Sequence, residues 1–427
     1  MKKMHYAWAV LASCCAISFG FGLTANSAGQ YLVPILTELE FGMGEYQLSM
    51  SIRGVFSFIS LALLNKMMAK INLRLLMSSC MLVMIAGMAL TSTFTHLWQW
   101  YAIGAVMGFV GPPTQMIIPP ILINNWFVKK KGFAIGIAMT FSGIGGAIMN
   151  PVLAWIIQAY NWRVAYFVNA AIVGLILMPF LMFVVALKPS DKGLKPYGYE
   201  ETEEDASGGG AREDRNRDAD PADTEKKPLN GVPYEKAIRS ISFIFMLFIF
   251  GVSGFVGGYN QILTAYGISL GLTATAAAFL PSLGMIGNVA GKVVLGVVSD
   301  KAGGMVMMYA VLGIGFSAML LLLTGVWTPV FFLAIGAFLS GNLLTLISVG
   351  TPLLTSTVYG ERDYSRIYVA LSLGQSVIST LCSPLIGFMY DFSGGFTLSF
   401  MVGTGVLSLS FGAVYLAYKT SRKLYAM

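Results

Sequence analysis

The sequence predicts an all-α polytopic membrane protein with twelve transmembrane helices in two six-helix halves. Three observations predict this fold: strong hydropathy, recurring apolar runs, and one hydrophilic segment that divides the runs six and six. Of the 427 residues, 56% are hydrophobic and only 11% are charged, whereas a soluble domain carries about 25% charged residues. The apolar runs are close to the length of about 20 residues that crosses a bilayer as a helix.

The apolar segments have soft edges and fall into two sets. They run near 7–34, 47–68, 73–93, 97–124, 132–158 and 163–187, and then near 239–268, 274–298, 304–324, 328–352, 365–389 and 396–418. We therefore expect an N-terminal half at 1–187, a linker at 188–237 and a C-terminal half at 238–427. The halves repeat each other at a nearly constant offset, which indicates a parallel internal repeat.

The linker and the loops differ in charge. The linker holds 13 of the 20 acidic residues and 9 of the 27 basic ones, with scattered glycine and proline, a composition that predicts disorder. Apart from Arg163, the basic residues of the other loops and of the chain ends fall on one side if the segments alternate. The positive-inside rule then places both termini and the linker in the cytoplasm. We expect a multi-pass protein of the plasma membrane (the bacterial inner membrane) with lipid rather than nucleic acid as its partner.

Two positive charges, Lys292 and Arg53, lie deep inside apolar segments. Lys292 precedes Asp300 by eight residues, and Arg53 follows Glu45 by eight. Each charge is therefore about 12 Å inside a hydrocarbon layer about 30 Å thick. No acidic residue lies inside a comparable stretch. Unpaired cations at this depth usually mark a solute path, and a passing anion could neutralise them.

Both cations have alternative interpretations. The ammonium of Lys292 could reach the cytoplasm along its flexible stem. Arg53 could lie nearer the outer interface, where it would pair with Glu45 or with lipid phosphate. These alternatives remain open at the level of sequence.

Further polar residues inside the segments are candidates for the same path. Asn26 and Gln30 are four residues apart and share one helix face. The full set of candidates is Asn26, Gln30, Tyr31, Gln115, Tyr259, Asn260, Asn342, Tyr368 and Gln375. The same residue types also form hydrogen bonds that hold membrane helices together, which is the alternative for each of them.

Two motifs resemble a known family. Gly296-x-x-Ser-Asp-Lys-x-Gly303 resembles the signature loop between helices 8 and 9 of the major facilitator superfamily, and a degraded copy follows the second segment. The resemblance implies a gating role for Gly296, Asp300, Lys301, Gly303, Lys70 and Arg74. The stretch 126–136 together with 142–146 looks like the fifth-segment signature of monocarboxylate porters and of the related oxalate:formate antiporters.

The resemblance also assigns a substrate contact. In these families helix 8 carries a basic residue that contacts the substrate carboxylate, and Lys292 stands at the matching position. The antiporters have a second lysine in helix 11, where this sequence has Gln375. We expect Arg53 to supply the second charge, which favours a smaller or more weakly charged anion than oxalate.

The leading hypothesis is a secondary active transporter of a small organic anion, expected to be a monocarboxylate, that works by alternating access. The alternative is a drug or hydrophobic-solute exporter of the same fold, although a polyspecific cation exporter would need a buried acid. We expect no enzymatic activity, no cofactor and no metal, because no Walker loop, metal spacing or catalytic constellation is present. We expect a monomer, and coupling to protons or to a counter-anion stays open, as does uniport.

Overall fold

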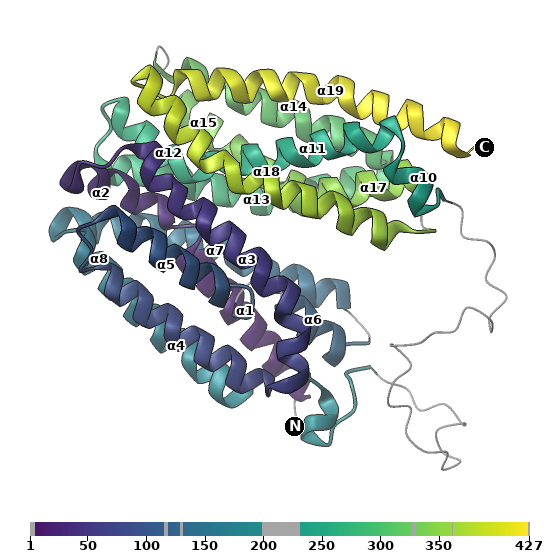
Figure 1. Ribbon diagram of the computed structural model, residues 1–427, viewed down its shortest axis with the longest axis horizontal. Helices are drawn as coiled ribbons and strands as arrows, with labels where there is room; N and C mark the ends of the chain where they lie inside the picture. Colours follow the sequence, from purple (N-terminus) through teal and green to yellow (C-terminus); the bar gives the residue numbers. More distant parts are fainter. Residues whose placement is uncertain are drawn as a thin grey trace.

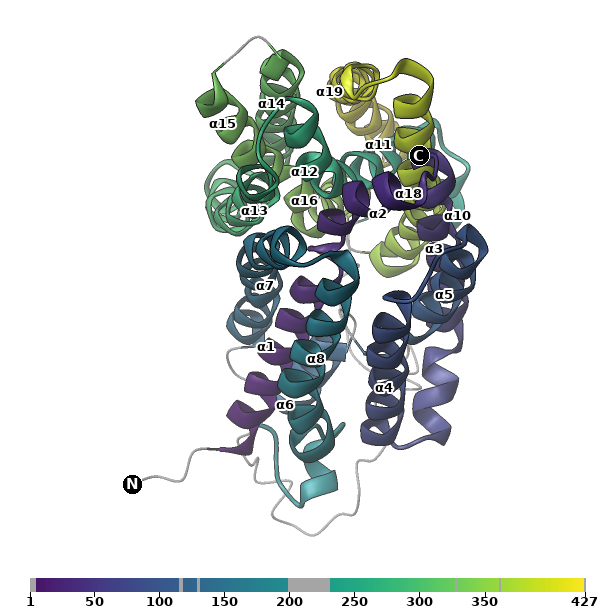
Figure 2. The same ribbon diagram turned by 90° about the vertical axis from the view of Figure 1, so that its left-hand side faces the viewer.

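The computed structural model describes residues 5–114, 118–128, 131–198, 231–326, 329–360 and 362–425. Within these ranges the secondary structure is helical apart from two isolated β-bridges. Figure 1 shows two bundles, α1–α8 below and α11–α19 above, which we call the N half and the C half. Figure 2 shows the same two bundles after a quarter turn. The predicted fold class is confirmed.

The N half contains six spans. They are α1 (Tyr6–Thr24) with a 3-10 turn (Ala28–Tyr31) and α2 (Leu32–Leu39); α3 (Met43–Lys70); α4 (Leu73–Thr91); α5 (Leu97–Val110) with α6 (Ile118–Trp126); α7 (Lys131–Ala159); and α8 (Trp162–Pro179) with a π turn (Phe180–Val184). The fourth span is interrupted because Pro112 and Pro113 cannot donate to the helical ladder. Pro119 and Pro120 lie in the first turn of α6, where proline is tolerated.

The C half repeats this arrangement. Its spans are α11 (Ile241–Gly257) with α12 (Tyr259–Ser269); α13 (Ala274–Ala302); α14 (Gly304–Leu323); α15 (Val330–Ser340) with α16 (Asn342–Thr345), a π turn (Leu346–Gly350) and α17 (Thr351–Tyr359); α18 (Tyr364–Ser393); and α19 (Thr397–Tyr425). The pair α11–α12 bends by 41° at Gly258, where the missing side chain lowers the resistance of the backbone to bending.

The two ends of the predicted linker are structured and pack on the two halves. Beyond a 3-10 turn (Pro189–Lys192), the backbone N–H of Tyr197 donates to the carbonyl of Trp126 at 2.8 Å. At the other end α10 (Tyr234–Ile238) begins with an N–H that donates to Asp363 at 2.9 Å. The two ends of the linker carry apolar side chains that can be buried, whereas the sequence of its middle part is rich in charged residues. Residues 199–230 lie outside the described ranges, so the predicted disorder and domain limits remain predictions.

The halves meet mainly through two helix pairs, α3 with α18 and α7 with α13, and the 3-10 turn Ala28–Tyr31 adds a third contact with α12. At the first pair, a Cβ on Gly387 would lie 2.8 Å from the Cα of Gly44, so glycine permits this close approach. The carboxylate of Asp391 accepts hydrogen bonds from the N–H groups of Met43 and Gly44 at 3.0 and 2.7 Å. We call this end of the molecule the closed end.

The halves separate toward the other end. Figure 1 shows them diverging toward the side that carries the N and C labels, which we call the open end. Among the described residues, the hydrogen bonds between the halves come from the part nearer the closed end. They join Gln30 to Thr264, Met43 and Gly44 to Asp391, Ser51 to Thr380, and Thr275 to Gln158. The conformation is therefore closed at one end and open at the other.

Candidate functional site

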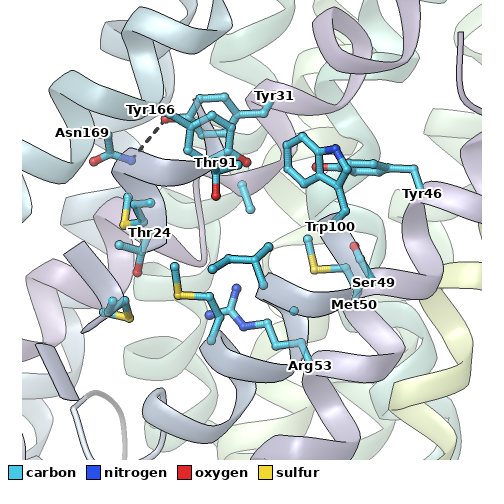
Figure 3. A pocket seen from close by; sticks show the side chains of 16 residues that line it. Thr24, Tyr31, Tyr46, Ser49, Met50, Arg53, Thr91, Trp100, Tyr166 and Asn169 are labelled. Carbon is cyan, nitrogen blue, oxygen red and sulfur yellow. Dashed lines mark hydrogen bonds between the residues drawn. The ribbon is translucent and has the colours of Figure 1, made fainter. Parts of the chain in front are cut away.

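A small chamber lies inside the N half, between the first span, α3, α4, α5 and α8 (Figure 3). Its volume is about 90 Å³. Aromatic and methionine side chains make up most of its wall. The lining residues are Thr24, Ala28, Tyr31, Tyr46, Ser49, Met50, Arg53, Met84, Met88, Thr91, Trp100, Ile103, Gly104, Met107, Tyr166 and Asn169.

A second, larger cavity lies between the halves and has a volume of about 380 Å³. The N half contributes α1, α3 and α5 to its wall, and the C half contributes Gln261 from α12 and a row of hydroxyl residues, Ser379, Thr380 and Ser383, from α18. Four residues line both cavities: Ala28, Met50, Arg53 and Met107. Arg53 therefore stands on the wall that the chamber shares with this interface cavity.

The guanidinium of Arg53 points from α3 toward the middle of the chamber (Figure 3). The side chain is half-buried and, within the described part of the chain, donates no hydrogen bond and forms no ion pair. A Cβ on Gly108 would lie 2.2 Å from the carbonyl oxygen of Arg53. Glycine at this point lets α5 press against α3 and fixes the backbone that carries the arginine.

The aromatic wall is held by its own contacts. The rings of Tyr31 and Tyr166 stack with centroids 3.8 Å apart, and Asn169 donates to the Tyr31 hydroxyl at 3.3 Å. Trp100 meets Tyr46 edge to face at 5.1 Å. The indole N–H of Trp100 is buried and has no acceptor among the described residues. Because buried donors are normally satisfied, this wall of the chamber holds an unused hydrogen-bond donor.

The second predicted cation, Lys292, lies on α13 of the C half. Its side chain is half-buried and, like Arg53, donates no hydrogen bond and forms no ion pair within the described ranges. Lys292 lines neither the chamber nor the interface cavity. Its predicted contact with substrate remains a prediction.

The polar candidates of the first span take different positions. Tyr31 lines the chamber, as described. The Gln30 amide is buried and donates to Thr264 across the two halves at 2.9 Å. The Asn26 amide donates to the carbonyl of Ser142 at 3.0 Å within the N half. Gln30 and Asn26 therefore make the helix-to-helix contacts named as the alternative for such residues.

Five further candidates, Tyr259, Asn260, Asn342, Tyr368 and Gln375, lie in the C half. The Tyr259 hydroxyl donates to the carbonyl of Ser399, and Asn342 donates to Leu339 within its own span at 3.1 Å. Gln375 donates to Ser253 at 2.8 Å, and the Tyr368 ring stacks on Tyr364. Asn260 is buried, and neither of its amide atoms has a partner in the described part of the chain. Gln115 lies outside the described residues.

The predicted gating residues lie at helix ends on the open side. Arg74 donates to the carbonyl of Val185 at 3.1 Å, whereas Lys70 and Lys301 are exposed. Gly303 has a φ of +87°, which a residue with a side chain would adopt only with strain. Gly296 and Asp300 lie on α13, and the structure does not describe the surroundings of either residue. Across the described ranges, no group of three His, Cys, Asp or Glu could hold a metal ion.

The sequence prediction found Tyr31 but missed the other aromatic residues of the chamber, Tyr46, Trp100 and Tyr166. Tyr46, Met50 and Arg53 are spaced four and then three residues apart, so they share one face of α3. That spacing is visible in the sequence, and it could have predicted that Tyr46 and Met50 lie on the same helix face as Arg53. Trp100 and Tyr166 gave no such signal, because they come from two other spans.

Two bundles of six spans with a cavity between them, joined at one end and separated at the other, are the architecture of a membrane transporter. Residues 10–327 match the Major Facilitator Superfamily profile, and the chain belongs to this family. The recognition made from the sequence motifs is confirmed.

The relatives and solved structures agree with this assignment. Monocarboxylate transporter 12-B of Danio rerio is 26% identical over 348 residues, which cover 76% of this chain and 69% of the relative. Monocarboxylate transporter 13 of Rattus norvegicus is 28% identical over 75% of this chain and 69% of the relative. A crystal structure of a bacterial homolog of the human lysosomal transporter Spinster, inward-facing and unoccupied, superposes with a TM-score of 0.69 at 14% identity and covers 99% of each chain.

Proposed function

We propose that this protein is a secondary transporter that carries a small monocarboxylate anion by alternating access. The observation that carries the proposal is the position of Arg53. Its guanidinium faces the chamber, stands beside the interface cavity, and has no acidic partner among the described residues. The printed names of the relatives, monocarboxylate transporters, support the same substrate class.

The chemistry of Arg53 suits a carboxylate. A cation inside the membrane is costly when it has no counter-charge, and a bound anion removes that cost. The planar guanidinium offers parallel N–H donors that match the two oxygens of a carboxylate. In the described conformation Arg53 is the one charged residue among those that line the two cavities, so it can neutralise a single carboxylate there.

Alternating access would use the two ends of the molecule in turn. In the described conformation the interface cavity lies between halves that are joined at the closed end and separated at the open end. An anion that also contacts Lys292 when the open end closes would favour the occluded state. This second contact from the C half is part of the proposal.

Uptake by proteoliposomes tests this function. We expect the full-length protein to take up lactate or butyrate saturably, with competition from other monocarboxylates but not from succinate. Lys292→Gln should reduce uptake more than about tenfold, because the occluded state loses a charge-assisted contact. Lys419→Gln, an exposed lysine near the end of α19, should transport normally. Normal uptake by Lys292→Gln would remove Lys292 from the site.

The predicted orientation places the open end and both termini in the cytoplasm of a cell whose plasma membrane holds the protein. We expect cysteine at Thr93, in the exposed turn after α4, to react with an impermeant maleimide on intact cells. Cysteine at Ser207, in the linker, should react only after permeabilisation. Both variants need a background in which Cys14, Cys15, Cys80 and Cys382 are replaced. The opposite labelling pattern would invert the orientation.

A further inference from the structure

The interface cavity carries uncharged hydrogen-bonding groups that the protein itself does not use. Along α18, the hydroxyls of Ser376 and Thr380 donate to backbone carbonyls of their own helix at 2.9 and 2.8 Å. Ser379 and Ser383 line the cavity, and neither hydroxyl makes a hydrogen bond within the described ranges. They are four residues apart and therefore share one helix face. This face presents two unused hydroxyl groups to the cavity.

Three further polar groups line the same cavity from other helices. Ser57 on α3 lies four residues after Arg53 and shares the face that carries the guanidinium. The Gln261 side chain on α12 makes no hydrogen bond to any described residue. Pro112 has no N–H, so the carbonyl of Gly108 loses the donor that a continuous helix would supply. Unused donors and acceptors of both halves therefore share the cavity with Arg53.

We propose that the preferred substrate is a polyhydroxylated monocarboxylate, a sugar acid such as an aldonate, whose hydroxyl groups bind these polar groups of the interface cavity. The proposal rests on the anion transport proposed above and names its substrate class. Arg53 holds the carboxylate, while Ser379, Ser383 and Gln261 from the C half bind hydroxyl groups along the carbon chain. Simple acids such as butyrate bind through Arg53 alone and therefore more weakly.

Closure of the open end makes such a match necessary. While the halves are separated at this end, water can satisfy the polar groups of the wall. When the halves close around a substrate and expel water, each polar group without a partner raises the free energy of the occluded state. A substrate hydroxyl both donates and accepts, so it can pair with a serine hydroxyl, a carboxamide or a carbonyl. An alkyl chain of the same length would leave these groups unpaired.

The rest of the wall suits the carbon chain of the same substrate. Phe21, Met50 and Met107 line the cavity and offer apolar surface to C–H groups. A neutral sugar would leave Arg53 without a counter-charge. A dicarboxylate would bring a second charge that no other described residue of the lining neutralises. One carboxylate combined with several hydroxyl groups meets both requirements.

Isothermal titration calorimetry of the purified full-length protein with gluconate, hexanoate and sorbitol at neutral pH tests the proposal. The three compounds have the same number of carbons and differ in their carboxylate and hydroxyl groups. We expect gluconate to bind at least about 100-fold more tightly than hexanoate, because hexanoate leaves the polar groups of the wall unpaired. Sorbitol should not bind, because it brings no charge to Arg53. Equal affinities for gluconate and hexanoate would overturn the proposal.

Ser383→Ala should lower the affinity for gluconate about tenfold and leave that for hexanoate unchanged, because it removes one hydroxyl contact. Ser376→Ala is the matched control: Ser376 is exposed on the same helix, bonds to its own backbone and does not line the cavity. It should bind both acids like the wild type. Gln261→Leu removes a polar group from α12 at similar size. Wild-type gluconate affinity in both Ser383→Ala and Gln261→Leu would refute the proposed contacts.

The outcomes separate this proposal from the anion transport on which it rests. If neither acid binds, both proposals fail. If the two acids bind equally and the hydroxyl and amide variants change nothing, the carboxylate site stands and the sugar-acid assignment fails. If sorbitol binds as tightly as gluconate, the hydroxyl contacts exist without a carboxylate site, which contradicts both the anion function and an acidic substrate.

Discussion

Replacing Arg53 by glutamine should abolish monocarboxylate binding, with affinity at least about 100-fold lower. Charge-assisted hydrogen bonds are the strongest contacts available to a carboxylate in a partly dry cavity. The glutamine side chain retains donors but no charge. Titration of the purified variant with butyrate measures the loss directly.

Although Arg53→Gln should lose affinity, its stability without ligand should rise or stay unchanged. Arg53 has no counter-charge within the described ranges, so its removal relieves an unpaired, half-buried cation. We expect the ligand-free melting temperature of Arg53→Gln to equal or exceed that of the wild type. Arg53→Lys should retain part of the affinity, because the charge survives while the two-pronged geometry is lost.

Arg366→Gln is the matched control, since Arg366 is exposed near the start of α18 and lines neither cavity. It should bind butyrate like the wild type. A double-mutant cycle of Arg53→Gln with Lys292→Gln should show coupling if both contact one ligand. Wild-type affinity in Arg53→Gln would reject the proposed site.

Replacing Asp391 by alanine should loosen the closed end. The Asp391 carboxylate accepts two hydrogen bonds from the first N–H groups of α3, a position where a helix presents unpaired donors and a partial positive charge. Alanine leaves those donors without their partner from the C half. We expect the population that is open at this end to rise on the order of tenfold.

Spin labels at Glu40 and Ser393, on opposite halves near this end, would report the change as a longer distance in Asp391→Ala. The control is Asp363→Ala at the other end of α18. Asp363 accepts from Tyr234, in the linker end that packs on the C half, so its removal should leave the label distance unchanged. An unchanged distance in Asp391→Ala would mean that the glycine contact between α3 and α18 keeps this end closed by itself.

Much of the fold could be predicted from the sequence. The length of an apolar segment predicts a membrane span, and the charge of a loop predicts its side of the membrane, and both can be read from neighbouring residues. The break in the fourth span follows from Pro112 and Pro113 in the same way. The depth of Arg53 was also readable, since Glu45 marks where its helix begins. In each case the deciding residues are neighbours in the chain.

The chamber and the closed end could not be predicted so well. Tyr46, Trp100 and Tyr166 converge only because three helices are rotated to particular angles, and a single sequence does not contain those angles. The partner of Asp391 is a pair of backbone N–H groups, which every residue except proline carries. No residue type therefore signals that contact.

The unequal size of the two cavities beside Arg53 has a pharmacological consequence. A rigid, bulky carboxylic acid could offer its carboxylate to Arg53 from the roomy side while its body stays too large for the chamber. Such a compound would compete with the transported substrate. It would keep the two halves separated at the open end and would not itself be transported. Inhibitors should then differ from transported substrates in the branching next to the carboxylate more than in lipophilicity.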